Sequence, residues 1–162
     1  MIYVEKIKTN IHNKIKQHVL SITNDINWHA KYYPRCDVLI ADISVNGSTF
    51  EVPLLLKTVE EIHNNLYDTP MVGIEWWINK YPSRSYQELH NHTLDNVKTI
   101  AWNYFLHLPP NSGSFVAGNT VLGDDMEGTI VFFPPDVMHE VTPNNSNDIR
   151  YTIAGNIVYD YI

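Results

Sequence analysis

The sequence predicts a mainly β protein with helices in its N-terminal part. Two stretches before residue 70, at about 7–23 and 52–66, carry apolar residues at helical spacing. After Pro70 the chain holds only short β-type runs, which Pro, Gly and Asn interrupt. Many short strands separated by turn residues are typical of a sandwich, a barrel or a jelly roll, and not of a parallel α/β sheet.

Each helical stretch has one apolar stripe that needs a partner surface. The stripe of the first stretch consists of Ile7, Ile11, Ile15, Val19 and Ile22. The second stretch carries Pro53, which suits a first helical turn. Between the two, residues 37–45 alternate as a strand does, and Asn46-Gly47 then predicts a turn.

The β-type runs after Pro70 have no break long enough to divide them. We expect strands within 71–81, 85–92, 99–108, 128–134, 139–143 and 150–161. The prediction is one domain over 1–162, with 1–70 as a helical support region for a β core at 71–162. At 162 residues the chain is long enough to bury a sizeable core.

Composition excludes several classes of function. The chain is 44% hydrophobic and 18% charged, as globular proteins are, and its net charge of −7 comes with no Lys/Arg cluster for a nucleic acid. Cys36 is the single cysteine, the N-terminus does not resemble a signal peptide, and no apolar run could span a membrane. We therefore expect a cytoplasmic protein that binds neither membrane nor nucleic acid; a homodimer stays open.

The first candidate site is the run Gln87-Glu88-Leu89-His90-Asn91-His92. On an extended backbone, side chains repeat every two residues, so Glu88, His90 and His92 are expected on one face. Two imidazoles in this spacing offer ligands to iron, zinc, copper or nickel. A His-x-His pair also occurs by chance, so a solvent-exposed pair without metal stays an alternative.

The second candidate site lies at the C-terminal end. A strand ends at Pro134-Pro135, His139 opens another short strand, and Asn144-Asn145 is a turn signal. If the chain folds back there, His139 and Arg150 become cross-strand neighbours with Cβ atoms about 5 Å apart. Both would point into the β core, and Thr152 would share their face.

An arginine inside an apolar core indicates a bound anion. Its planar guanidinium matches a carboxylate through two parallel hydrogen bonds, and burial without an anion would be unfavourable. A metal-ligating His139 beside Arg150 thus indicates a ligand that reaches the metal at one end and carries a carboxylate at the other. The cosubstrate 2-oxoglutarate has this shape. The alternative is a surface pair between Arg150 and Asp148.

The stretch from Trp77 to Asn156 resembles the 2-oxoglutarate/iron(II) oxygenases of bacteria and marine phages, a branch related to the prolyl 4-hydroxylases. The resemblance covers about half of the chain. It rests on Trp77-Ile78-Asn79, Gln-x-x-His-x-His at 87–92, Tyr104-Phe105-Leu106 before Pro109, Gly-x-Ile-Val-x-Phe-Pro at 128–134, His139-Glu-Val-x-Pro, and Arg150-Tyr-Thr-Ile.

This resemblance implies a double-stranded β-helix, the cupin-like jelly roll, that binds Fe(II) and 2-oxoglutarate. His90 and His139 would hold the metal, Arg150 and Thr152 would bind the far carboxylate of 2-oxoglutarate, and Tyr104 would line the cosubstrate pocket or simply belong to the core. With dioxygen, such a hydroxylase couples oxidative decarboxylation of 2-oxoglutarate to oxidation of a substrate C–H bond.

The third metal ligand departs from the family pattern. Most of the superfamily carries His-x-Asp/Glu, whereas this chain has His92 in that place. Glu88 and Asp95 are the alternative carboxylates. We favour His92, because it has the ligand spacing.

Two other functions stay open. A cupin-type dioxygenase with three histidines would use no 2-oxoglutarate, and Arg150 would then bind the carboxylate of its substrate. A metal-binding β-roll module without catalysis would keep the fold alone. The prime substrate, a small molecule or a protein side chain, is not specified, because its pocket would be built from loops such as 80–86 and 109–127.

Overall fold

The computed structural model describes residues 1–30, 38–42 and 52–161. The expected strand at 37–45 is confirmed where it is described, as β3 (Leu39–Asp42). Cys36 and the expected turn at Asn46-Gly47 lie outside the described residues.

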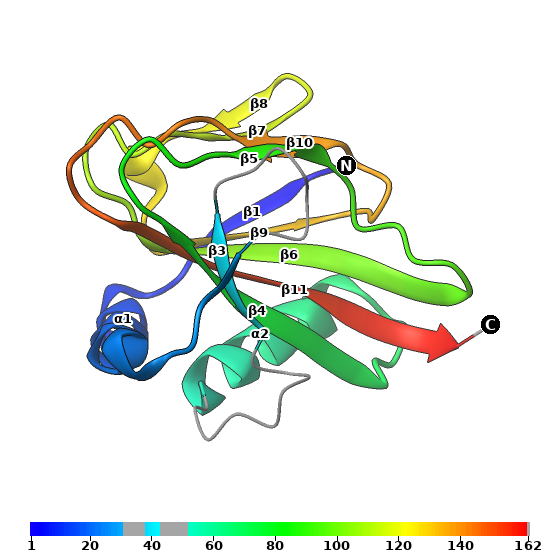
Figure 1. Ribbon diagram of the computed structural model, residues 1–162. Helices are drawn as coiled ribbons and strands as arrows, with labels where there is room; N and C mark the ends of the chain where they lie inside the picture. Colours follow the sequence, from blue (N-terminus) through cyan, green and yellow to red (C-terminus); the bar gives the residue numbers. More distant parts are fainter. Residues whose placement is uncertain (31–37, 43–51, 162) are drawn as a thin grey trace.

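Two antiparallel sheets lie one above the other, and helices cover the larger one (Figure 1). The major sheet has the order β1 (Tyr3–Lys6), β9 (Thr129–Phe133), β6 (Val97–His107), β11 (Arg150–Tyr161), β4 (Gly73–Tyr81), β3 and β2 (His29–Ala30). The minor sheet has the order β5 (Gln87–His90), β10 (His139–Val141), β7 (Phe115–Ala117) and β8 (Thr120–Leu122). The predicted jelly roll is confirmed.

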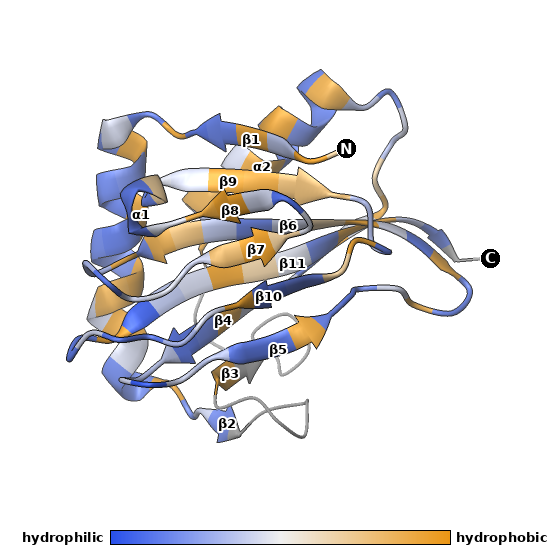
Figure 2. Ribbon diagram, turned by 90° about the horizontal axis from the view of Figure 1, so that it is seen from above, coloured by the Kyte–Doolittle hydropathy of each residue, from blue (hydrophilic) through white to orange (hydrophobic). Residues whose placement is uncertain are grey.

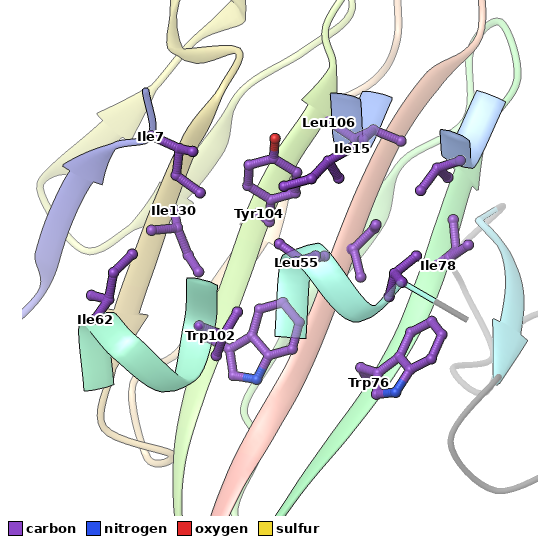
Figure 3. Close-up of a cluster of buried hydrophobic side chains, with 14 of the residues drawn as sticks. Ile7, Ile15, Leu55, Ile62, Trp76, Ile78, Trp102, Tyr104, Leu106 and Ile130 are labelled. Atoms are coloured by element: carbon purple, nitrogen blue, oxygen red, sulfur yellow. The ribbon is translucent and has the colours of Figure 1, made fainter. Parts of the chain in front are cut away.

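Both expected helices are present, as α1 (Thr9–Ile22) and α2 (Pro53–Leu66). Pro53 occupies the start of α2, where its missing N–H is no loss. The apolar stripes of both helices pack on the outer face of the major sheet, where Ile15, Leu55 and Ile62 form one cluster with Trp102, Tyr104 and Ile130 (Figure 3). Each such buried side chain contributes about 1.5–3 kcal/mol of hydrophobic stabilisation.

Strand β6 is buried on both faces because it lies in the middle of three layers. Trp102 and Leu106 face the helices, whereas Ala101 and Phe105 face the minor sheet. Strand β9 beside it is hydrophobic after its first residue, Thr129 (Figure 2). The alternation of β6 therefore separates a helix-covered outer face from an inner face, and Asn103 lies on the inner one.

Strands β4 and β11 pair without a break and define the inner face. Their antiparallel register sets Glu75 opposite Asn156, Trp77 opposite Ala154, Asn79 opposite Thr152, and Tyr81 opposite Arg150. Because side chains alternate along a strand, these four pairs form a row across the two strands. The row carries most of the polar residues that the site uses.

The expected pairing of His139 with Arg150 is wrong. Strand β10 pairs with β5 and β7, while β11 pairs with β4 and β6, so the two residues belong to different sheets. Asn144 explains the difference. Its buried side-chain amide donates hydrogen bonds to the carbonyls of Tyr81 (3.0 Å) and Asp148 (2.8 Å), which fixes the connection as a crossover between sheets and not as a hairpin.

The first 70 residues are more than a helical support. Strands β1, β2 and β3 extend both edges of the major sheet, although each has only two to four residues. Strands β7 and β8 lie in a segment that we expected to be a loop. Runs this short carry too little periodicity to be recognised. In the described part of the chain no helix is long and apolar enough to cross a membrane.

Candidate metal centre

Three histidines converge between the two sheets. His90 and His139 are direct cross-strand partners in the minor sheet. His92 lies in the loop after β5, where its backbone N–H donates to the carbonyl of Pro135 at 2.8 Å. One ring nitrogen from each residue lies within 4.8 Å of the other two, which is the arrangement that a single metal ion needs. The structure thus brings together the three predicted ligands.

A β-bulge interrupts strand β5 between Gln87 and His90. The register between β5 and β10 shifts between the His139–His90 and Val141–Gln87 pairs, so strand β5 contains one extra residue. Gln87 and His90 are therefore both buried, Glu88 between them is half-buried, and the strict alternation expected for this run is interrupted. Among the described residues, the histidine cluster includes no carboxylate from Glu88 or Asp95.

Hydrogen bonds fix the tautomer of each ring. The Nδ1 atoms of His90 and His139 lie 2.8 Å and 3.0 Å from the backbone carbonyls of Glu88 and Val137. A carbonyl only accepts, so each Nδ1 carries the proton and the lone pair of the neutral ring is on Nε2. His92 Nδ1 likewise lies 3.1 Å from Asn156 Oδ1. All three rings are thus prepared to bind a metal through Nε2.

Burial keeps the three imidazoles neutral. It lowers the pKa of His139 to about 3 and that of His92 to about 4, and in each case a neighbouring histidine lowers the pKa further. Burial also lowers the pKa of His90, against the opposing effect of the Glu88 carbonyl. At neutral pH a metal therefore has no protons to displace from the site.

Aromatic side chains hold the rings in place. The ring centroid of Trp77 lies 5.5 Å from that of His92, and Phe133 packs against both His92 and His139, at 5.9 Å and 4.8 Å. Phe115 contacts His139 from the minor sheet. These contacts reduce the rotamer freedom that metal binding would otherwise have to remove.

The histidines open into a cavity of about 330 Å³ between the sheets. Amide side chains dominate its polar lining, with Asn79, Asn103 and Asn156 on the inner face of the major sheet. Glu75 is the single carboxylate among the described residues that line the cavity, and none of them is Lys or Arg.

Arg150 also lies on the inner face of the major sheet. It is a buried cation with unused hydrogen-bond donors. Its side chain is fully buried, and burial lowers its pKa to about 10, which still leaves it protonated at neutral pH. Nη1 donates to the carbonyl of Gly113 at 2.7 Å, whereas Nε and Nη2 have no partner in the described part of the chain. A surface pair with Asp148 is thus wrong. The two unused donors fit a carboxylate.

Thr152 and Asn79 connect Arg150 with the cavity. Thr152 is buried two residues beyond Arg150, and Asn79, which lines the cavity, donates to its hydroxyl at 3.2 Å. Arg150 itself does not line the cavity. The polar row on β4 and β11 therefore runs from the histidines toward the guanidinium.

Comparison with solved structures identifies the architecture. Over 98% of the chain, the fold matches a prolyl-4-hydroxylase from Pseudomonas putida at 14% identity, with a TM-score of 0.77 and 92% of that chain covered. It matches a Trichoplax adhaerens prolyl hydroxylase, in complex with a hypoxia inducible factor peptide fragment, at 16% identity (TM-score 0.76, 83% of that chain). A viral collagen prolyl hydroxylase from Paramecium Bursaria Chlorella virus-1, with 2-oxoglutarate bound, matches at 15% identity (TM-score 0.72, 98% and 96% of the two chains).

The chain has the fold of the 2-oxoglutarate/iron(II) oxygenases. No protein-family model and no curated protein matches its sequence. Identities of 14–16% show a shared fold and not a shared activity. The chemistry of the site therefore has to be inferred from the side chains of this protein.

Tyr104 does not occupy the place expected of a cosubstrate residue in this oxygenase fold. It lies on the outer face of the major sheet, under the helices (Figure 3). Its hydroxyl hydrogen-bonds Nδ1 of His12 on α1, and His12 Nε2 lies 3.3 Å from Glu127 Oε2. The physical reason is the alternation of β6, which points Tyr104 away from Asn103 and Phe105. Tyr104 is therefore a core tyrosine, as the alternative interpretation of the sequence had it.

Two residues of the site were not recognised from the sequence. Asn156 contacts His92, and Asn156 Nδ2 in turn donates to Glu75 Oε2 at 3.2 Å. Strand phase could have found both, because Asn156 alternates in step with Arg150 and Thr152, and Glu75 in step with Trp77 and Asn79.

Proposed function

We propose that this protein is a 2-oxoglutarate- and Fe(II)-dependent dioxygenase of the hydroxylase type. The observation that carries the proposal is a pair of complementary features between the two sheets. Three neutral histidines offer Nε2 lone pairs at one place, and the buried guanidinium of Arg150 offers two unused donors at another. A ligand with a metal-chelating end and a carboxylate end satisfies both.

The donor set fits Fe(II). Imidazole nitrogen is a ligand that iron accepts, and His90, His92 and His139 would hold the ion while its other coordination positions serve ligands. When bound, Fe(II) and 2-oxoglutarate supply the oxidation: dioxygen, 2-oxoglutarate and a substrate C–H bond give succinate, CO₂ and a hydroxylated substrate.

The role of the protein in this reaction is to bind, orient and exclude water. Arg150 would hold the distal carboxylate of 2-oxoglutarate in a bidentate pair, and Thr152 would add a hydroxyl beside it. Phe105 and Tyr81 flank the guanidinium, each with its ring centroid 5.9 Å from Cζ, and exclude water from the pair. The prime substrate, a small molecule or a protein side chain, would enter the cavity bordered by Trp77.

A three-histidine dioxygenase without 2-oxoglutarate is the second candidate. The absence of a carboxylate from the cluster of described ligands favours it, as does the position of Arg150 outside the cavity lining. In that case Arg150 would bind a carboxylate of the substrate. The feature that it explains less well is Thr152, buried next to Arg150 and hydrogen-bonded to Asn79.

Succinate formation tests the proposal. Purified protein with Fe(II), ascorbate and 2-oxoglutarate should release succinate slowly even without a prime substrate, and the Arg150→Lys variant should release less. Dioxygen uptake without succinate would favour the three-histidine dioxygenase. Metal binding with neither dioxygen uptake nor succinate, in the presence of candidate peptides and small molecules, would favour a non-catalytic module.

A further inference from the structure

His92 is the ligand candidate that departs from the family pattern. Its role here rests on the proposed function, in which His90, His92 and His139 bind a metal. Replacing the usual carboxylate by a third neutral imidazole leaves the full +2 charge of the ion without an anionic protein ligand. The site therefore gains from a negative charge placed nearby.

Glu75 supplies a negative charge on the wall of the same cavity. It is the only carboxylate among the described lining residues, and no Lys or Arg accompanies it there. Its side chain is linked to His92 through one residue: Glu75 Oε2 accepts from Asn156 Nδ2 at 3.2 Å, and Asn156 Oδ1 accepts from His92 Nδ1 at 3.1 Å. Asn156 is buried, and the strand register places it directly opposite Glu75.

The direction of these two hydrogen bonds follows from donor and acceptor chemistry. A carboxylate only accepts, so Glu75 forces the amide of Asn156 to present its NH₂ group. The amide oxygen then faces His92, which must donate from Nδ1, and the lone pair of the ring is left on Nε2. The carboxylate thereby selects the tautomer that binds a metal.

We propose that Glu75 and Asn156 are positioning residues that hold His92 in its metal-binding tautomer and provide, one residue removed, the negative charge that the three histidines lack. The other two histidines do not need such a relay, because backbone carbonyls already fix their tautomers. The Nδ1 hydrogen bond of His92 goes to a side chain instead, and Trp77 packs on its ring from the same strand as Glu75.

Metal affinity under anaerobic conditions tests the relay. Chelator competition with Co(II) or Fe(II) should show binding weakened by about 10- to 100-fold in Asn156→Leu, the range typical for loss of a partner of a ligating histidine. Glu75→Gln, which keeps a hydrogen-bonding group but removes the charge, should weaken binding by a smaller factor of about three to ten.

The matched control is Asn103→Leu. Asn103 is a buried amide of the same cavity whose side-chain oxygen has no partner among the described residues, and its replacement should leave metal affinity within about twofold. If Asn156→Leu fails to fold, Glu75→Leu replaces it, because Glu75 is only half-buried. This variant should also bind metal more weakly than the wild type. Equal affinity in wild type, Glu75→Leu and Asn156→Leu overturns the relay.

A charge swap gives a second, independent readout. In the double variant Glu75→Gln/Asn156→Asp, residue 75 donates and residue 156 accepts, so His92 Nδ1 again meets an acceptor and the negative charge is retained. This variant should bind metal at least as tightly as the wild type. Affinity no better than that of Asn156→Leu overturns the proposal, since a merely structural role for the pair predicts no rescue.

The tautomer itself can be observed in the metal-free protein. Long-range ¹H–¹⁵N spectra of histidine-labelled protein should show His92 with its proton on Nδ1 in the wild type, and a detectable Nε2–H population in Asn156→Leu. An unchanged tautomer in that variant overturns the relay. Failure of the wild type to bind any metal would instead overturn the proposed function, so the two results are distinguishable.

Discussion

The two faces of the major sheet both bury histidines, but they use them differently. On the outer face, His12 engages both ring nitrogens, with the hydroxyl of Tyr104 and with Glu127, and His63 does the same with Tyr159 and Asn64. On the inner side, each histidine of the candidate metal centre hydrogen-bonds through Nδ1, which leaves the lone pair on Nε2, and these rings gather at one point.

The same contrast holds for the buried charges. On the helix side, the Glu127 carboxylate accepts hydrogen bonds from Lys16 Nζ at 3.0 Å and from the backbone N–H of Leu108 at 2.9 Å. Burial raises its pKa, but these hydrogen bonds outweigh burial and bring the pKa below its usual value. Arg150 on the inner face donates to one carbonyl, that of Gly113, among the described residues. The Glu127 network is thus satisfied within the protein, whereas Nε and Nη2 of Arg150 have no partner among the described residues and fit a bound ligand.

The largest expected effect separates the two kinds of histidine directly. His139→Ala should reduce bound metal from about one ion per chain to nearly none, since it removes one of three ligands. His12→Ala, the matched change on the outer face, should lower the thermal midpoint but keep full metal content. Elemental analysis of both variants, with circular dichroism as the check on folding, measures this. Full occupancy in His139→Ala would contradict the assignment.

The next effect is the pH dependence of the metal-free protein. Free histidine in the unfolded chain has a pKa near 6.5, whereas folding lowers the pKa of His92 to about 4 and that of His139 to about 3. Between these values the unfolded state binds more protons, so stability falls as the pH drops below about 6.5, with a slope of up to about 1.4 kcal/mol per pH unit for each histidine.

Urea unfolding at several pH values measures that slope. His139→Gln should flatten it, because one of the titrating groups is gone, whereas Lys57→Gln at an exposed position of α2 should not. A metal-free protein equally stable at pH 7 and pH 5 would show that the inner histidines are not buried as the structure has them.

Arg150→Lys should have an intermediate effect. The lysine keeps the charge but loses the paired hydrogen bonds, so binding of 2-oxoglutarate should weaken by about 1–3 kcal/mol, or roughly five- to 150-fold in dissociation constant. Metal affinity should hardly change. An anaerobic titration of the Fe(II) protein with 2-oxoglutarate gives the number. Wild-type affinity in the variant would mean that Arg150 does not bind the cosubstrate.

How far the sequence predicts this site depends on how local each feature is. The spacing of His90 and His92 predicts their convergence, and the phase of Arg150 and Thr152 predicts their common face, because both follow from the backbone of one short segment. The pairing partner of His139 is not local. It depends on Asn144 capturing two carbonyls to carry the chain from one sheet to the other, and no period in the sequence shows that.

The fold could be predicted for a similar reason only in its long elements. The stripes of α1 and α2 and the runs of β4, β6, β9 and β11 are long or apolar enough to show a period. The short strands β1, β2, β7 and β8 form because neighbouring strands offer them an edge. The bulge in β5 is likewise imposed by pairing with β10.

The smallest effect comes from Tyr104, and it tests the comparison from the other side. Tyr104→Phe removes only the hydroxyl that hydrogen-bonds His12, and it leaves a buried ring nitrogen without that partner. We expect a loss of about 1–2 kcal/mol in the free energy of unfolding. Metal and 2-oxoglutarate affinities should stay within about twofold, because Tyr104 faces the helices while the histidines lie on the opposite side of the sheet.

Phe105→Leu, one residue further along β6 but beside Arg150, should show the reverse. It should reduce the affinity for 2-oxoglutarate more than it lowers the stability of the protein. A tenfold loss of 2-oxoglutarate affinity in Tyr104→Phe would restore Tyr104 as a cosubstrate residue and would end the division of the sheet into a structural and a functional face.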